Sequence, residues 1–367
     1  MLASISRAVD AVRSKTYELP LAREYVRHWG MKEAIRELIQ NALDSDSPFE
    51  YAFDQGTLYI VSRFARLEPS TLVLGTTSKA DDAAAIGSFG EGYKIALLVL
   101  TRLGYPVEVL NGNRQWVPEF RQSSTFGTEV LCIHESPIQR QATGVEFIVS
   151  GLSDEDVALI KDGCLNMQPP MGDVIGTKYG HILPSRPGKL YVGSLFVCET
   201  ELAYGYDIKP EFLTLERDRQ TVSGWDLRST TKDMWIDHGD FDRLAKMIDE
   251  KMPDVSYVEY GSTAMVKEAC YELFIKKYPG ALIAKSAEEM KSMVARGLVQ
   301  TIYIGGAMHS QVSTSKSYIA HAATIHRVTT PEQDLKEWFD NNRKYMSRLP
   351  IVSFKELMAK ASNWRNK

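Results

Sequence analysis

Three features are scarce in this sequence: cysteine, long apolar runs and net charge. The four cysteines are widely separated and form no CxxC pair: Cys132, Cys164, Cys198 and Cys270. This spacing argues against zinc and redox motifs and predicts reduced, mostly buried thiols in a cytoplasmic protein. No run of about 18 apolar residues occurs, so we expect no membrane-spanning helix. Residues 1–20 also lack the apolar core of a signal peptide.

Charge is nearly balanced, with 43 lysines and arginines against 47 aspartates and glutamates and a formal net charge of -4. This balance argues against strong non-specific binding to nucleic acid, although it leaves room for a local basic patch, so a nucleic-acid partner is not indicated. At 367 residues the chain is too long for one ordinary core, which predicts two or three domains.

Hydrophobic periodicity predicts interleaved helices and strands in the first 150 residues. A helix is predicted over 21–45, with a break near Gly30, and a second over 94–103. Short strands are predicted at four places: 58–61, 107–110, 129–134 and 145–149. Because these strands are short and lack regular crossovers, the pattern favours a mixed α+β sandwich over a doubly wound parallel sheet.

The second half of the chain follows a Pro/Gly-rich stretch at 168–188 that predicts a domain boundary. Beyond it we expect a strand or a hairpin at 189–198 and helices at 241–251 and 263–277, the first of them capped by the turn at 237–242.

A βαβ unit is predicted near the C-terminus. Its strands are expected at 281–284 and 299–304, and the capping box formed by Ser286 and Glu289 opens the helix between them. Two charged amphipathic helices are expected over 330–367. The sequence therefore predicts three domains, at 1–165, 185–278 and 279–367.

The segment 35–44 places apolar and polar side chains on opposite faces of a helix, at about 100° per residue. Glu37, Asn41 and Asp44 share the polar face. One interpretation is a surface helix with a solvated polar face. The other is a catalytic helix, on which the Asn41 side-chain oxygen ligates Mg²⁺ and Glu37 activates a water that attacks a γ-phosphate.

A glycine-rich loop leads into the second predicted helix. Gly87, Gly90 and Gly92 form a GxxGxG, which is neither the GxGxxG of dinucleotide folds nor a P-loop. Glycines at a helix entrance let backbone N–H groups converge on an anion. Lys79 and Lys94 would add phosphate-facing charge. A flexible loop with glycine turns is the alternative.

In this order and separation, the two segments resemble the GHKL superfamily of gyrase B subunits, large heat-shock chaperones, MutL proteins and sensor kinases. ELIQNALD at 37–44 is similar to the family's N-box, which implies Glu37 as general base and Asn41 as the Mg²⁺ ligand. GTTSK and IGSFGEGYK, at 75–79 and 86–94, resemble the G2 box and its approach. The resemblance places further residues at the nucleotide: Asp44, Phe89, Glu91, Tyr93 and Lys94.

The resemblance covers about residues 20–150 and implies a Bergerat-type ATP-binding α/β sandwich, a transducer-like α/β domain and a small C-terminal α/β unit. ATGVEF at 142–147 is similar to a later family strand, on which Thr143 would lie near the adenine. One box departs. Where the family has DxGxG, this chain has SRFAR at 62–66, so Ser62 replaces the aspartate and both glycines are missing. A serine hydroxyl still accepts a hydrogen bond, which predicts an atypical base pocket in a divergent branch.

Transducer domains of related proteins carry a basic residue that reaches the γ-phosphate. Arg217 or Arg219, in TLERDRQ at 214–220, would have that role, unless the segment is an ordinary charged turn. The sequence thus predicts an ATP- and Mg²⁺-dependent switch with slow hydrolysis, which dimerises on nucleotide binding or acts on an unidentified protein partner. The alternatives are a scaffold that has lost ATP binding and a nucleic-acid machine. A sensor kinase is disfavoured, because no phosphoacceptor histidine segment precedes the N-box.

Overall fold

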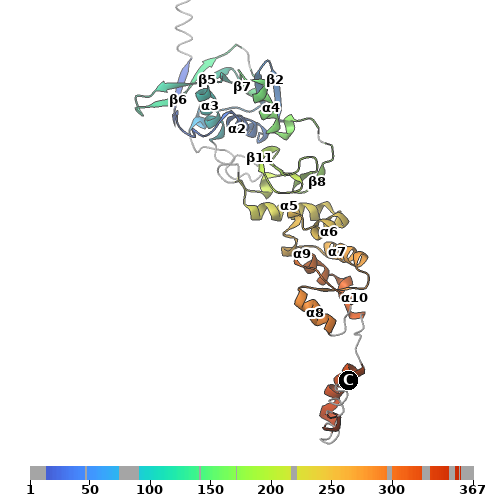
Figure 1. Cartoon of the computed structure of the whole chain (residues 1–367). Coiled ribbons are helices and arrows are strands. Elements are labelled where there is room, and N and C mark those ends of the chain that lie inside the picture. Colours follow the sequence, from blue (N-terminus) through green and yellow to red (C-terminus); the bar gives the residue numbers. More distant parts are fainter. Residues whose placement is uncertain are drawn as a thin grey trace, which may run out of the picture. The chain divides into compact units, whose positions relative to one another are not determined.

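The computed structural model describes residues 14–45, 48–73, 91–139, 142–170, 172–215, 221–295, 300–324, 331–346, 352–354 and 356. The chain divides into two compact units, Met1–Met234 and Trp235–Lys367 (Figure 1). The three-domain division remains a prediction. Across the described ranges, no helix is both long enough and apolar enough to cross a membrane.

A seven-stranded sheet forms the centre of the first unit. Its order is β1-β6-β5-β4-β7-β3-β2, and every neighbouring pair is antiparallel. The strands are β1 (Lys15–Ala22), β2 (Glu50–Asp54), β3 (Thr57–Arg63), β4 (Val107–Asn111), β5 (Arg114–Gln122), β6 (Glu129–Pro137) and β7 (Gly144–Val149). The predicted mixed α+β class is confirmed, and the four strands expected here are present.

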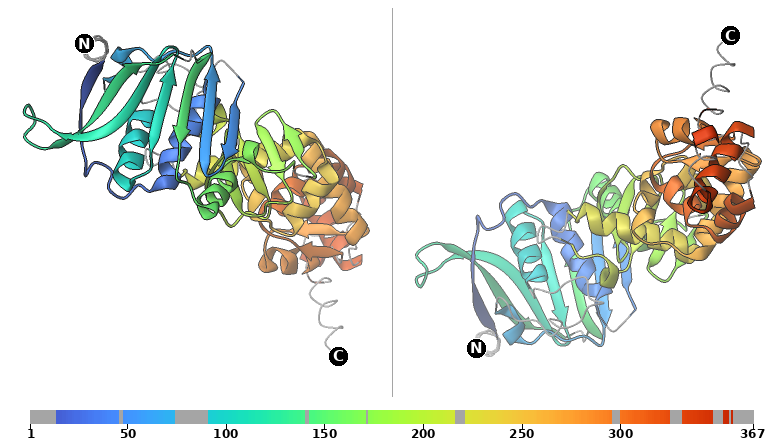
Figure 2. Two further views of the ribbon diagram at one scale, coloured as in Figure 1. Left: turned by 90° about the horizontal axis from the view of Figure 1, so that it is seen from above. Right: turned by 90° about the horizontal axis from the view of Figure 1, so that it is seen from below.

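Two helices cover one face of this sheet, α2 (Met31–Leu43) and α3 (Gly92–Leu103) (Figure 2). Their apolar side chains, such as Leu38 and Leu97, are fully buried in one core with the sheet. The short helix η1 (Pro69–Leu72) follows β3, and α3 ends at Gly104, which has a φ of +86°. A left-handed glycine is a common helix terminator.

The prediction of one helical segment over 21–45 is wrong in its first part. Residues 15–22 form the edge strand β1, a turn follows, and α2 begins at Met31. Tyr17, Leu19 and Leu21 alternate toward the core, as the period of two in a strand requires. Gly30 caps α2, and its N–H donates to the Glu33 carboxylate at 2.8 Å, so the helix starts just after the predicted break.

A second sheet lies in the same unit, after α4 (Asp154–Asp162) and η2 (Leu165–Met167). Its order is β11-β10-β12-β9-β8, with only β10 and β12 parallel. The strands are β8 (Ile175–Thr177), β9 (Gly180–Leu183), β10 (Lys189–Val192), β11 (Leu195–Glu199) and β12 (Gly205–Ile208). Of the two alternatives predicted at 189–198, a strand or a hairpin, the structure has the hairpin, β10–β11. η3 (Pro210–Phe212) and α5 (Gly224–His238) follow, and the division between the units falls within α5.

The second unit is mainly helical and contains the predicted βαβ unit. Strands β13 (Leu282–Ala284) and β14 (Thr301–Tyr303) pair in parallel on either side of α8 (Ala287–Ala295). The other elements are α6 (Phe241–Asp249), η4 (Pro253–Val255), η5 (Val258–Tyr260), α7 (Ala264–Lys277), α9 (Gly306–Ser313), α10 (Lys316–Thr324), α11 (Pro331–Asn342) and η6 (Arg343–Tyr345). The predicted cap of α6 is confirmed, since the Asp240 side chain accepts from the N–H of Arg243 at 3.1 Å.

Candidate functional site

Glu37 is the first predicted site residue whose environment differs from that of a surface residue. It belongs to α2 and is only 1% exposed, although it lies opposite the apolar stripe of the helix. A buried carboxylate loses hydration, so this position is costly for a side chain without a specific environment. The interpretation of α2 as a helix with a solvated polar face therefore does not describe Glu37.

The N-terminal end of α3 lies directly against this carboxylate. A Cβ atom added to Gly92 would lie 2.3 Å from Oε2 of Glu37 and 3.5 Å from Nδ2 of Asn41. Only a glycine lets the helix begin this close to α2 without displacing the carboxylate. The structure thus brings Gly92, the last glycine of the second predicted motif, against Glu37 of the first.

The amide of Asn41 has a fixed orientation at the same point. Its Nδ2 donates to the carbonyl oxygen of Glu37 at 2.8 Å, so Oδ1 is directed away from that carbonyl and can act as an acceptor or a metal ligand. Asp44 lies at the C-cap of α2 and is partly exposed. Glu91 lies at the N-cap of α3.

Tyr93 and Lys94 use their polar ends to hold the chain that follows β3. The Tyr93 hydroxyl lies 2.8 Å from Oγ1 of Thr71, and burial raises the pKa of Tyr93 to about 12. The ammonium group of Lys94, a fully buried residue, donates to the carbonyl oxygen of Val73 at 2.6 Å. Burial lowers the pKa of Lys94, and the charge of Glu91 opposes that change. A contact of Lys94 with phosphate remains a prediction.

The end of β3 and the start of β7 bring Ser62 and Thr143 close together. The N–H of Phe64 donates to the carbonyl oxygen of Thr143 at 3.1 Å. A Cβ added to Gly144 would lie 2.1 Å from the carbonyl oxygen of Ser62, so a glycine is needed for this approach. Ser62 is 6% exposed, on the helix-covered side of the sheet, whereas the Thr143 side chain is exposed.

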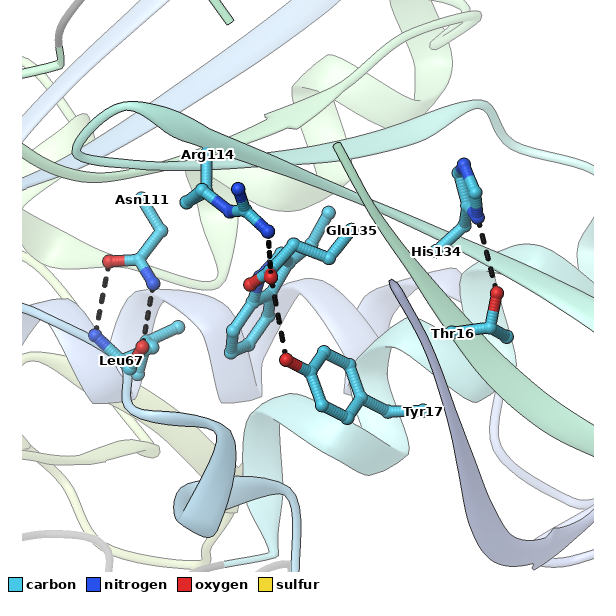
Figure 3. A network of polar contacts seen from close by, with 8 residues as sticks. Thr16, Tyr17, Leu67, Asn111, Arg114, His134 and Glu135 are labelled. Carbon is cyan, nitrogen blue, oxygen red and sulfur yellow. Dashed lines mark hydrogen bonds and ion pairs between the residues drawn. The ribbon is translucent and has the colours of Figure 1, made fainter. Parts of the chain in front are cut away.

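Asn111 was not predicted from the sequence, and it fixes the loop after β3. Its Oδ1 accepts from the N–H of Leu67 at 3.1 Å, and its Nδ2 donates to the carbonyl oxygen of Leu67 at 2.6 Å (Figure 3). Asn111 precedes Gly112 in the turn between β4 and β5, so the sequence signals a hairpin there. Nothing in that signal indicates a contact with residue 67.

A second polar network, also missed, joins β1, β5 and β6. The buried carboxylate of Glu135 accepts from Arg114, from Nε1 of Trp116 at 2.8 Å and from the hydroxyl of Tyr17 at 3.4 Å (Figure 3). Burial alone would raise the pKa of Glu135, but the hydrogen bonds from Arg114 and Trp116 and the Arg114 charge hold it below its ordinary value. The donors surround the carboxylate, so the network stabilises this part of the sheet.

Six predicted site residues lie outside the described residues: Lys79, Gly87, Phe89, Gly90, Arg217 and Arg219. Within the described part, the structure brings together Glu37, Asn41 and Gly92 at one point and Ser62 with Thr143 at another.

Comparison with known proteins shows a distant likeness that carries no functional information. No protein-family model matches the chain. An uncharacterized protein of Mycoplasma pneumoniae is 25% identical over 213 residues, which cover 53% of this chain and 86% of that protein. The likeness transfers no activity, because that protein is itself uncharacterized.

Proposed function

We propose that this protein is a GHKL-type ATPase, in which Mg²⁺-dependent binding and slow hydrolysis of ATP drive a conformational switch. The observation that carries the proposal is the position of the buried Glu37 carboxylate against Gly92, with the amide of Asn41 beside it. The proposed base, the proposed metal ligand and the last glycine of the predicted loop would then meet at the N-terminal end of α3.

The fold of the first unit supports the proposal. The helix α2, the hairpin β2–β3, the helix α3 and the strands β4 to β7 follow one another in the order expected for a Bergerat-type domain. Both helices lie on one face of an antiparallel sheet. A nucleotide would bind between these helices and the sheet end that carries Ser62 and Thr143.

The donor set fits a magnesium nucleotide. Mg²⁺ takes oxygen ligands and usually combines few protein oxygens with phosphates and water, and Oδ1 of Asn41 is oriented by the hydrogen bond of its own amide nitrogen. Mg²⁺ would neutralise charge on the phosphates. Glu37 would accept the proton of the attacking water. Turnover is expected to be slow, since chemistry would require closure of the site.

Phosphate release by the full-length protein tests the catalytic part. We expect the Glu37→Gln variant to bind MgATP but to release phosphate about 100-fold or more slowly than the wild type. Glu135→Gln is the matched control, because it neutralises another buried carboxylate of the same unit. It should lower stability while turnover per folded molecule is retained. Equal inactivity of wild type and Glu37→Gln, with nucleotide still bound, would exclude Glu37 as the base.

A non-catalytic scaffold is the second candidate. Ser62 stands where a nucleotide-binding relative would have a carboxylate, and the ammonium group of Lys94 already bonds to Val73. Thermal shifts with MgATP, MgGTP and MgADP separate the two candidates, since the scaffold responds to none of them. Light scattering with a non-hydrolysable ATP analogue tests the proposed dimerisation of two copies.

A further inference from the structure

We propose that Ser62 and Phe64 form a base-recognition surface that accepts adenine and guanine alike, so the substrate class is purine nucleoside triphosphates. The inference rests on the proposed function, because it assumes that a nucleotide binds beside the Glu37 and Gly92 contact. It goes further by naming Phe64, which no motif identified, and by removing the preference for ATP.

Phe64 is held in an unfavourable conformation with its ring in solvent. Its φ is +63°, a left-handed value, and the residue is 84% exposed. For a residue with a Cβ atom, this backbone conformation costs about 1 kcal/mol or more. An exposed phenyl ring also lacks the stabilisation that burial of its apolar surface would give. Strain of this kind persists where surrounding structure enforces it and is concentrated at functional sites.

The surroundings of Phe64 enforce the conformation from both sides. The N–H of Phe64 bonds to Thr143 at 3.1 Å, and Asn111 holds Leu67 through two hydrogen bonds of 3.1 and 2.6 Å. The close approach at Gly144 fixes the carbonyl of Ser62. The exposed ring therefore stands on a constrained turn two residues after Ser62, which suits a stacking platform for a planar base.

Ser62 supplies the polar half of the surface. Only 6% of the surface of Ser62 is exposed, and its hydroxyl forms no hydrogen bond with any residue that the structure describes. A ligand that bonds to this hydroxyl in place of water would gain a hydrogen bond at a position that is shielded from most of the solvent.

The hydroxyl of Ser62 does not discriminate between adenine and guanine. A hydroxyl both donates and accepts, whereas an ionised carboxylate only accepts. It can accept from the N6 amino group of adenine or donate to O6 of guanine. Stacking on Phe64 does not discriminate either, because every base has a π-face.

Calorimetric titration of the full-length protein with non-hydrolysable analogues of ATP and GTP, each with Mg²⁺, tests the inference. We expect the two Kd values to agree within about threefold, because neither contact selects one purine. Phe64→Gly should weaken both analogues by roughly 5- to 100-fold. The same substitution should raise the melting temperature, since glycine adopts a positive φ without strain.

The matched control is Gln55→Gly at the opposite end of β3. Gln55 is exposed and has a φ of +45°, so glycine should also raise the melting temperature there but leave both Kd values unchanged. Ser62→Ala should weaken both analogues equally. Ser62→Asp, if it folds, should favour the ATP analogue by tenfold or more, since an ionised carboxylate accepts from N6 and cannot donate to O6.

The outcomes separate this inference from the proposed function. If the wild type binds neither analogue, both are overturned. If Asn41→Ala weakens binding but Phe64→Gly does not, the nucleotide site stands and Phe64 belongs to another surface, such as a protein contact. A Kd for the GTP analogue more than tenfold above that of the ATP analogue would overturn the purine tolerance alone.

Discussion

Among the glycines of the first unit that allow a close approach, Gly92 and Gly144 have neighbours that differ in stiffness. A Cβ on Gly92 would meet the end of the Glu37 side chain at 2.3 Å, whereas a Cβ on Gly144 would meet the backbone oxygen of Ser62 at 2.1 Å. A side-chain end can rotate away at small cost, while a paired strand cannot. Gly92 is therefore needed for the position of the Glu37 carboxylate, whereas Gly144 is needed for the stability of the fold.

The variant Gly92→Ala should separate activity from stability. Alanine at the start of α3 suits the helix, so the free energy of unfolding should change by less than about 1 kcal/mol. Phosphate release should fall about tenfold or more, because the carboxylate is displaced. Urea denaturation and a phosphate assay check the two parts. Gly144→Ala, as the contrast, should lower the free energy of unfolding by several kcal/mol through strain in the β3–β7 pairing. If Gly92→Ala were inactive and as unstable as Gly144→Ala, the distinction between the two glycines would be contradicted.

Glu135 should make the first unit sensitive to acid. Its folded pKa lies below its unfolded value, so its contribution to stability is present above the unfolded pKa and is lost as the pH falls through the folded pKa. At neutral pH, Glu135→Gln should cost about 2–4 kcal/mol, because Arg114 loses its charged partner. Urea denaturation at several pH values should show this deficit shrinking below about pH 4. A deficit that stays constant with pH would contradict the ion-pair account.

At the scale of elements, β1 shows how a tertiary contact changes a local prediction. The sequence predicts a helix that begins at residue 21, yet residues 15–22 pair with β6. Their alternating apolar side chains fit a strand, and the partner strand lies more than a hundred residues later in the sequence. Helices α2 and α3 needed no such partner for recognition, since their apolar stripes follow the helical period.

The start of α8 offers a test of a local signal. The N–H of Glu289 donates to Oγ of Ser286 at 3.1 Å, and the Glu289 carboxylate accepts from the N–H of Lys285 at 2.6 Å. Ser286→Ala should therefore cost about 1 kcal/mol, measured by denaturation of the second unit. Ser292→Ala, an exposed position within the same helix, should cost nothing, and equal losses from both variants would contradict a capping role.

At the scale of the whole molecule, the proposed nucleotide site lies within the first unit. Glu37, Asn41, Ser62, Gly92 and Thr143 all precede Met234, where that unit ends. The βαβ unit belongs to the second unit and contributes none of these residues.

Calorimetry should resolve this division. We expect two unfolding transitions, one lowered by Glu135→Gln and the other by Ser286→Ala. A magnesium nucleotide at 100 times its Kd should stabilise only the first, by about 2.7 kcal/mol. Equal shifts of both transitions would mean that the units unfold together and would contradict the assignment of the ligand to one unit.

The sequence alone determined the elements whose signals are local. The helical period placed Glu37 and Asn41 on one face of α2, the apolar pattern indicated a strand or a hairpin at 189–198, and the capping box located α8. Each signal is contained within one or two turns or a single hairpin, so nearby residues are enough to specify it.

Only the tertiary structure decided which of these elements meet. It placed the carboxylate of Glu37 against Gly92, joined Asn111 to Leu67 and surrounded Glu135 with donors from two other strands. These contacts depend on strand order and on the packing of helices against the sheet. Residues far apart in the sequence come together only when the whole sheet forms, and no local pattern records that arrangement.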